Sequence, residues 1–192
     1  MKEILKLIVS LALISSAAGL LLAYTYKVTA TPIATASQKG TTQALADVLP
    51  PFDNNPGNNR ITFEEAGRSW TNYVARKDGK FVGAAFETSS KNGYGGEIKI
   101  MVGITANGRI KAIRFLSQHE TPGLGTKVTE VPFKSQFDDK SIEGTVWSVK
   151  KDNGSFDAVT GATISSRAVL EAVRDGVAVY TKHTDEIART GE

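Results

Sequence analysis

Asp157-Ala158-Val159-Thr160-Gly161-Ala162-Thr163 is the stretch at which the hydrophobic period of the sequence changes. Before it, residues 145–149 and 156–159 are rich in β-branched and aromatic residues and flank Asn153-Gly154, a pattern that predicts a β-hairpin. After it, apolar residues recur at the i, i+3, i+4, i+7 spacing of an amphipathic helix over about residues 165–182. The sequence therefore predicts that Thr163 lies where a strand turns into a helix.

The predicted start of this helix favours an anion. The first N–H groups of a helix have no intrahelical partner and the helix dipole is positive at that end, so phosphate groups bind there readily. Gly161 and Ala162 leave space for a bulky group near the backbone. The alternative is that Thr160, Thr163 and Ser165 are ordinary helix N-caps. The residues alone leave both interpretations open.

Residues 157–163 resemble the flavin-attachment motif Asp-x-x-(Ser/Thr)-Gly-Ala-Thr of the FMN-binding domain family. Two further stretches, Gly93-Tyr94-Gly95-Gly96 and His119-Glu120-Thr121-Pro122-Gly123-Leu124-Gly125, are similar to other signature stretches of this family and occur in the same order. The resemblance extends over about residues 70–180 and is closest to the G subunit of the Rnf electron-transport complexes. Three ordered motifs over this span make the resemblance specific.

The resemblance implies FMN joined to Thr163 through a phosphoester bond. Tyr94 would belong to the wall of the flavin site, whereas its stretch read alone also fits a flexible connector with a surface tyrosine. Thr121 and backbone N–H groups of its loop would face the polar edge of the isoalloxazine ring, and Leu124 would cover the ring face. The expected cofactor-binding residues are Thr163, Thr160, Gly161, Ala162, Asp157, Tyr94, Glu120, Thr121, Gly123, Leu124 and Gly125.

Attachment of the flavin is expected to need a second protein. A threonine hydroxyl is a poor nucleophile unless a base or a metal activates it, and Asp157 is the only evident base beside Thr163 in the sequence. The resemblance implies a separate flavin transferase that takes FMN from FAD and recognises the motif. Asp157 would contribute to that recognition or to the geometry of the turn, and no residue of this chain is assigned a catalytic role.

The composition excludes several kinds of site. The 192 residues include no cysteine, which excludes Cys-ligated iron–sulfur clusters, disulfides and thiol redox chemistry. The net charge of +3 is too small and too dispersed to indicate nucleic-acid binding. His119-Glu120 suggests a metal, but the other histidine, His183, lies in a polar tail and no HExxH spacing occurs, so no metal site is predicted.

The N-terminal region predicts a membrane anchor. Residues 7–26 carry no charge, and as a helix they would span the ~30 Å hydrocarbon layer of a bilayer. Lys2 and Lys6 precede this run, so the positive-inside rule puts the N-terminus in the cytoplasm and the rest of the chain outside it. The alternative is a cleaved signal peptide, for which Ala34-Thr35-Ala36 is a cleavage-like triplet.

The composition after the anchor changes to Thr, Ala, Asn and Pro, and it predicts a tether with little packing of its own. Within it, residues 43–49 are expected to form a short helix that Pro50-Pro51 stops. The expected divisions of the chain are residues 1–27 (cytoplasmic N-terminus and anchor), 28–60 (tether), 61–183 (FMN-binding domain) and 184–192 (polar tail).

Turn signals divide the domain into antiparallel strands. Residues 70–76 and 80–87 flank Asp78-Gly79, a strong two-residue turn signal. Residues 97–105 and 109–116 flank Asn107-Gly108 in the same way. Alternating Ile and Val in the first of these two predicts a strand buried on one face, whereas the second does not alternate cleanly and its buried face stays open.

These strands, the final helix and a helical turn near residues 134–137 predict an α+β fold. It would consist of an N-terminal transmembrane helix followed by an FMN-binding domain of antiparallel sheet with packed helices. Trp147 and Phe156 are expected in the core, and Lys150-Lys151 in a solvated turn.

Three hypotheses about function follow. The first is a redox subunit, not a complete enzyme by itself, that carries covalent FMN within an ion-translocating ferredoxin:NAD oxidoreductase of the Rnf type. It would span the cytoplasmic membrane once, with the FMN domain outside the cytoplasm, and would work with the other subunits of the complex. The second is the C subunit of a sodium-translocating NADH:quinone reductase, whose members are typically longer. The third is a non-redox, membrane-tethered binding or assembly module.

Overall fold

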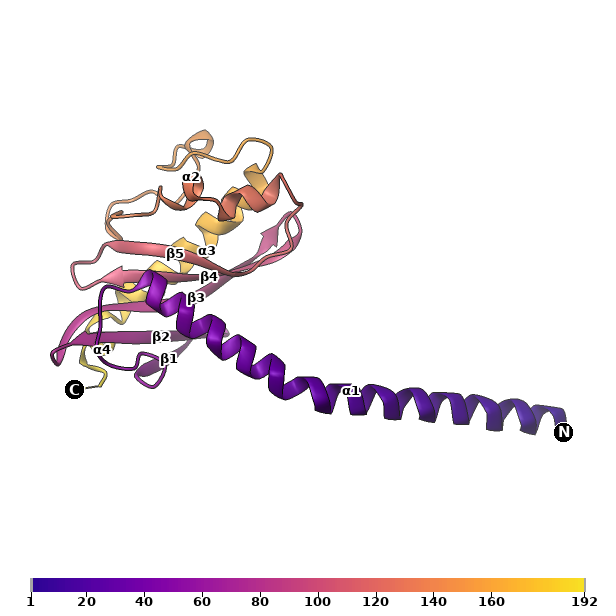
Figure 1. The fold of residues 1–192 in the computed structure, drawn as a ribbon. Coiled ribbons are helices and arrows are strands. Elements are labelled where there is room, and N and C mark those ends of the chain that lie inside the picture. The colour runs from indigo at the N-terminus through magenta and orange to yellow at the C-terminus, as the bar shows by residue number, and fades with distance from the viewer. Residues whose placement is uncertain (1, 192) are drawn as a thin grey trace. The chain divides into compact units, whose positions relative to one another are not determined.

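The computed structural model describes residues 2–191, and the side chains of all of these except residues 31 and 33–37. The chain divides into two compact units, one up to Gly40 and one from Thr41. The helices and strands in Figure 1 are α1 (Lys2–Val48), β1 (Arg60–Glu65), β2 (Arg68–Lys77), β3 (Lys80–Gly93), β4 (Gly96–Thr105), β5 (Ile110–Ser117), η1 (Gly125–Thr129), α2 (Val131–Lys134), η2 (Lys150–Asp152), α3 (Thr163–Lys182) and α4 (Thr184–Arg189).

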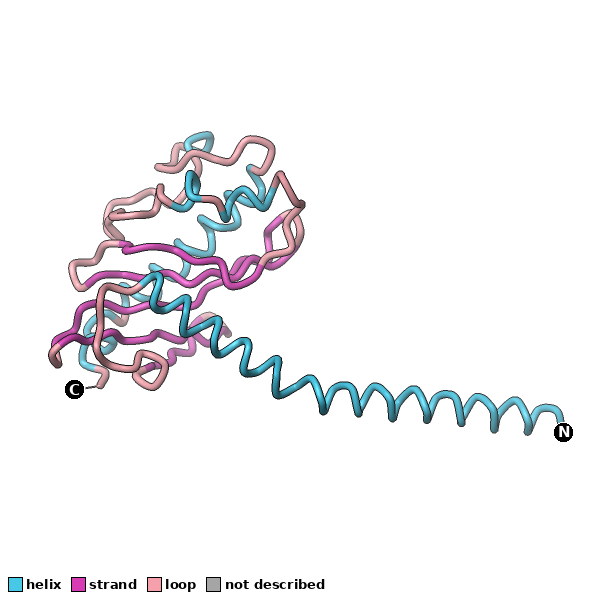
Figure 2. Tube along the Cα trace, viewed as in Figure 1, coloured by secondary structure: helices cyan, strands magenta, loops and turns pink. Residues whose placement is uncertain are grey.

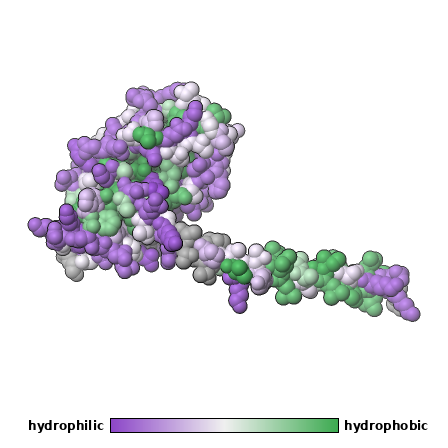
Figure 3. Space-filling model, viewed as in Figure 1, coloured by the Kyte–Doolittle hydropathy of each residue, from purple (hydrophilic) through white to green (hydrophobic). Residues whose placement is uncertain are grey.

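The first unit is helical. Within it, the Lys2–Ala30 part of α1 is long and apolar enough to cross a membrane, by length and composition. The side chains of residues 2–28 are exposed, and Figure 3 shows the apolar ones gathered along this helix. An exposed apolar helix of this length has the properties expected of a membrane anchor.

The second unit is built on an antiparallel sheet. Within residues 2–191, five strands pair in the order β1-β2-β3-β4-β5, each with its neighbours in the sequence (Figure 2). Asp78 and Gly79 have φ of 51° and 74°, the left-handed conformation of a tight type I′ hairpin turn. The two predicted hairpins and the α+β fold class are therefore confirmed.

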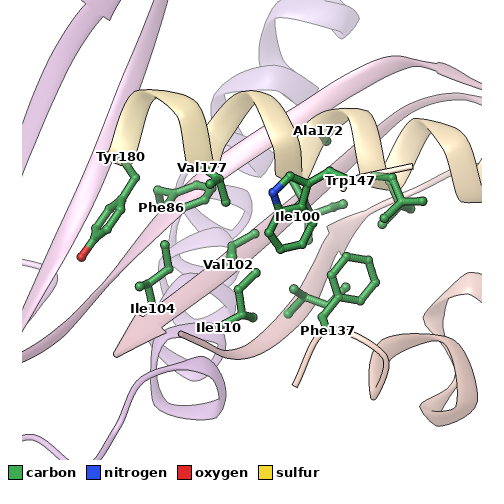
Figure 4. Close-up of a cluster of buried hydrophobic side chains, with 14 of the residues drawn as sticks. Phe86, Ile100, Val102, Ile104, Ile110, Phe137, Trp147, Ala172, Val177 and Tyr180 are labelled. Atoms are coloured by element: carbon green, nitrogen blue, oxygen red, sulfur yellow. The ribbon is translucent and has the colours of Figure 1, made fainter. Parts of the chain in front are cut away.

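The main core lies between α3 and one face of the sheet. Figure 4 shows Ala172 and Val177 of α3 beside Phe86 and Ile100 of the sheet. Gly176 lies at the closest approach, because a Cβ there would overlap with the ring of Phe86. Each buried aliphatic or aromatic side chain stabilises the fold by roughly 1.5–3 kcal/mol relative to an exposed one. Buried members of this cluster include Val74, Ile98, Val102, Ile104, Phe137, Phe156, Val169, Leu170 and Val173.

The opposite face of the sheet carries a second cluster, formed with the end of α1. Ala44, Leu45, Val48 and Leu49 are buried there against sheet residues such as Met101. The prediction that the tether, residues 28–60, packs little is therefore wrong for residues 44–49. Its apolar residues recur at helical spacing, and the helix ends at Val48, two residues before the proline pair that was expected to stop it.

The irregular alternation of apolar residues in β5 has a geometric cause. The pairing of β4 with β5 shifts register between Gly103 and Ile104, and again between Lys99 and Ile100. A β-bulge adds one residue to one strand, so the side chains after it change face. Ile110 and Ile113 therefore both reach the main core, although their odd separation would put them on opposite faces of a regular strand.

The hairpin predicted for residues 145–159 does not form. A single bridge joins Val149 to Phe156, and its direction is parallel rather than antiparallel. Between them lie η2 and Asn153, whose φ of 58° reverses the chain. The prediction was wrong because these apolar residues pack in an aromatic cluster instead of forming a strand. The rings of Trp147 and Phe156 stack 5.4 Å apart, and both residues are buried. Their predicted place in the core is confirmed.

The C-terminal segment expected as a polar tail folds back on the domain. It forms α4, in which Ile187 is fully buried. The guanidinium group of Arg76 donates hydrogen bonds to the carbonyl oxygens of Ala188 and Thr190. His183, which ends α3, stacks on Phe63 at 3.9 Å. These contacts join the end of the chain to β1 and β2.

Candidate functional site

The three sequence motifs meet at one hollow of about 500 Å³. Its walls come from the β3–β4 turn, the loop after β5 and the start of α3, which lie far apart in the sequence. A hollow of this size is within the range of small-molecule and cofactor sites. It is lined by Tyr94, Glu120, Thr121, Leu124, Gly125, Gly161, Ala162, Thr163, Ile164 and Ser165.

Thr163 is the first residue of α3 and is half-buried at the wall of the hollow. Among the described residues, no side chain caps this helix end, and the N-cap position is held by Ala162. Thr160, Thr163 and Ser165 are therefore not its N-caps. The first N–H groups of the helix have no intrahelical partner, so this end of α3 favours an anion beside Thr163.

Large apolar side chains lie exposed around the hollow. Tyr94 is 71% exposed, and Leu124 and Ile164 are each 50% exposed. Exposed apolar groups gathered at one concave place are typical of a site that a flat apolar ligand covers. Together with a hydroxyl and a helix N-terminus, these residues fit a flavin mononucleotide, which has an apolar ring system at one end and a phosphate at the other.

A buried carboxylate connects two of the walls. Glu120 is only 4% exposed. Its Oε1 accepts a hydrogen bond from the backbone N–H of Gly95 at 3.1 Å, and its Oε2 accepts one from the Ser165 hydroxyl at 2.5 Å. The backbone N–H of Glu120 donates to Oε1 of Gln118 at 2.6 Å. The β3–β4 turn and the first turn of α3 are thus held together through this side chain.

The glycines of the motifs are required by the close packing of the chain itself. A Cβ at Gly95 would overlap with the carbonyl group of His119. A Cβ at Gly125 would lie 2.5 Å from Oε2 of Glu120. Gly161 has a φ of 78°, a conformation that other residues rarely adopt, and it turns the chain into α3.

Three of the expected residues lie outside the lining of the hollow, namely Asp157, Thr160 and Gly123. The carboxylate of Asp157 pairs with Nζ of Lys150 at 2.7 Å, and its backbone N–H donates to Oε1 of Gln136 at 2.7 Å. Thr160 is exposed. Gly123 turns the loop with a φ of 74°, and its N–H donates to Oγ1 of Thr126. Asp157 and Gly123 therefore shape the neighbouring loops.

Sequence reasoning missed Ile164 and the role of Ser165. Ile164 is apolar but falls outside the buried stripe of α3. An apolar residue on the exposed side of a helix was a signal for a binding surface. The sequence suggests Ser165 only as an N-cap, and no local pattern could reveal its partner, since Glu120 lies 45 residues earlier. Over residues 2–191, no group of three or more His, Cys, Asp or Glu side chains is placed to hold a metal ion.

Comparison with known proteins gives a consistent result. A family model described as the FMN-binding domain matches residues 93–178. The G subunit of the ion-translocating oxidoreductase complex from Vibrio cholerae serotype O1 (strain M66-2) is 37% identical over 179 residues, which cover 87% of this chain and 85% of the relative. A protein of the same name from Pseudomonas aeruginosa (strain UCBPP-PA14) is 34% identical over 181 residues, with 87% and 84% covered.

Two solved structures have a similar fold. Shewanella oneidensis NqrC matches with a TM-score of 0.53 and 19% identity, over 75% of this chain and 73% of that one. The C subunit of the Na⁺-translocating NADH-quinone reductase from Parabacteroides distasonis ATCC 8503 matches with a TM-score of 0.50 and 22% identity, over 65% of each chain.

Proposed function

This chain belongs to the family of G subunits of ion-translocating oxidoreductase complexes, and on that premise we propose that it is a membrane-anchored electron-transfer subunit with FMN bound covalently to Thr163. The observation that carries the proposal is the hollow at the start of α3. There, Thr163 lies in the same lining as the exposed side chains of Tyr94 and Leu124. The relatives' name and the matched domain support a flavin subunit of an Rnf-type complex.

Each part of the hollow has a distinct task in this proposal. FMN supplies the capacity to take up and release electrons. Thr163 Oγ holds the phosphate, whose charge the free N–H groups of α3 and the helix dipole stabilise. Tyr94, Leu124 and Ile164 cover the ring and exclude water from it. A covalent bond keeps the cofactor on the protein through repeated redox cycles.

The attachment step is assigned to a separate flavin transferase. A bond forms between Thr163 Oγ and the phosphorus of the FMN half of FAD, and the pyrophosphate P–O bond breaks. AMP leaves with the electron pair, and the hydroxyl proton passes to a base of the transferase. Asp157 is exposed and anchored by Gln136 outside the hollow, so it is accessible to such an enzyme. Its own carboxylate pairs with Lys150 rather than activating Thr163.

The N-terminal helix is proposed as a single membrane span. The apolar Lys2–Ala30 segment supports this assignment. Lys2 and Lys6 at its start favour a cytoplasmic N-terminus, which puts the FMN domain on the other side of the membrane. The domain would exchange electrons there with other subunits of the complex.

The test is intact mass and in-gel flavin fluorescence after denaturation, on full-length protein co-expressed with a flavin transferase. We expect one FMN adduct on the wild type and none on Thr163→Ala. Thr62→Ala is the control, because it removes an exposed threonine outside both the motif and the hollow, and it should keep the adduct. Absence of an adduct on the wild type, while a known flavinylated domain is modified in the same cells, would contradict the covalent assignment. The domain would then be either a reversible flavin binder or the non-redox module.

A further inference from the structure

The buried Glu120 side chain occupies an unusual position for a charged group. Carboxylates are rarely buried unless they are paired or hydrogen-bonded. Glu120 is 4% exposed, yet the hydrogen bonds to its two oxygens come from a backbone N–H and a hydroxyl, of Gly95 and Ser165. Neither donor is a cation. Burial of this carboxylate at the wall of the hollow therefore carries a desolvation penalty.

The surrounding backbone is fitted to this side chain. A Cβ at Gly93 would lie 2.6 Å from Oε1 of Glu120, and one at Gly125 would lie 2.5 Å from Oε2. Both positions are glycine, so the carboxylate is enclosed on two sides by backbone. This enclosure fixes where the carboxylate lies relative to the lining residues Tyr94 and Thr163, which belong to the two elements it joins.

We infer that Glu120 is a positioning residue for the flavin, an inference that rests on the proposed function. It holds the β3–β4 turn, with Tyr94, at a set distance from the first turn of α3, with Thr163. In addition, its desolvated carboxylate at the wall of the hollow lowers the midpoint potential of the bound flavin.

The effect on potential follows from charge balance. Uptake of two electrons and one proton leaves the ring with one more negative charge than before. A carboxylate nearby disfavours that added charge, and the interaction is stronger in a desolvated site than in water. In a reductive titration, dithionite supplies the electrons and is itself oxidised.

The experiment compares Glu120→Gln, Glu120→Ala and a control, Glu171→Gln. A glutamine at position 120 can keep both hydrogen bonds, because its carbonyl oxygen accepts from Gly95 and its amide donates to the Ser165 hydroxyl. Glu171 is a matched control. It also joins α3 to the end of β3, accepting from the Ser90 hydroxyl at 2.6 Å, but it lines a different hollow. Full-length protein is co-expressed with a flavin transferase and reduced with dithionite against a dye of known potential.

We expect Glu120→Gln to keep its covalent FMN and to raise the midpoint potential. At a fixed solution potential its reduced-to-oxidised ratio should rise about tenfold, which is about 30 mV for a two-electron couple. Glu120→Ala loses both hydrogen bonds, and the fraction of protein carrying FMN should fall at least threefold. Glu171→Gln should leave the flavin content and the potential unchanged.

An unchanged potential in Glu120→Gln overturns the charge effect, and normal attachment in folded Glu120→Ala overturns the positioning role. Equal shifts in Glu120→Gln and Glu171→Gln would show a general effect of lost charge and would also overturn the inference.

Circular dichroism identifies folded variants. If Glu120→Ala does not fold, attachment in Ser165→Ala, which removes one of the two hydrogen bonds, decides the positioning role. A wild type without FMN is a separate result, because it contradicts the proposed function itself.

Discussion

The ring of Phe86 in β3 fills the space that a side chain at Gly176 of α3 would need. Thr88, two residues further along the strand, donates a hydrogen bond from its hydroxyl to the carbonyl oxygen of Ala172 at 2.7 Å. Helix and strand are therefore in close contact along the middle of α3. Because Thr163 begins the same helix, this contact also determines where the proposed attachment site lies relative to the sheet.

Gly176→Ala should destabilise the domain by about 1–3 kcal/mol, since the added methyl group forces Phe86 or the helix to move. The measurement is the free energy of unfolding from urea titration, followed by tryptophan fluorescence. Gly40→Ala is the control, because a Cβ at that position meets no atom within 4 Å. Equal stability of both variants would show that α3 can move away without cost.

Leu45→Ala should lower the free energy of unfolding by about 2–5 kcal/mol, the usual cost of truncating a buried leucine. Leu45 is only 3% exposed and packs on the face of the sheet opposite α3, whereas Gln43 on the same helix is exposed. Gln43→Ala is therefore the control and should change stability little. An equally small effect of Leu45→Ala would mean that this segment behaves as the tether first expected.

Tyr94→Ala should weaken reversible FMN binding by about 2- to 13-fold, because stacking on the ring is worth about 0.5–1.5 kcal/mol. The affinity is measured by fluorescence titration in the Thr163→Ala background, so that no covalent bond forms. Tyr94 is 71% exposed, and its loss should leave the stability of the unliganded protein nearly unchanged. Val131→Ala removes another side chain that is 71% exposed but lies outside the hollow, and the same loss of affinity there would refute the assignment.

Acid should destabilise the protein partly through Glu171. The hydrogen bond from the Ser90 hydroxyl is the main reason that the pKa of Glu171 is lowered from its usual 4.5. Since the folded state favours the carboxylate, its stabilising effect is present above pH 4.5 and is lost as the pH falls through the lowered pKa. The midpoint of thermal unfolding should therefore depend less on pH below 4.5 in Glu171→Gln than in the wild type. Parallel pH profiles would contradict this.

Local signals in the sequence were enough for much of the fold. The turn at Asp78-Gly79 and the helical period after Thr163 depend on residues close together in the chain, and the structure has both features. The family motifs were also evident, because each is a short continuous stretch. The cysteine-free composition excluded whole classes of redox site without any structure.

Other features depended on tertiary contacts. The bulges in the β4–β5 pairing put Ile110 and Ile113 on one face, and no pattern within a single strand reveals a bulge. Residues 145–159 have strand-like composition, but the rings of Trp147 and Phe156 pack against Phe137 and no hairpin forms. The same composition is therefore compatible with a hairpin or an aromatic cluster, and the side chains available for packing determine which one forms.

The sequence by itself determined which residues are expected to carry the chemistry: a threonine at a helix start, a tyrosine in a glycine turn and a glycine-rich loop. Only the tertiary structure decided that these stretches surround one hollow, that Asp157 faces Lys150 away from it, and that Glu120 joins two of its walls. The physical reason is separation along the chain. Turn type and helical period are set by neighbours, whereas a hydrogen bond between residues 45 positions apart exists only after the sheet and α3 have packed.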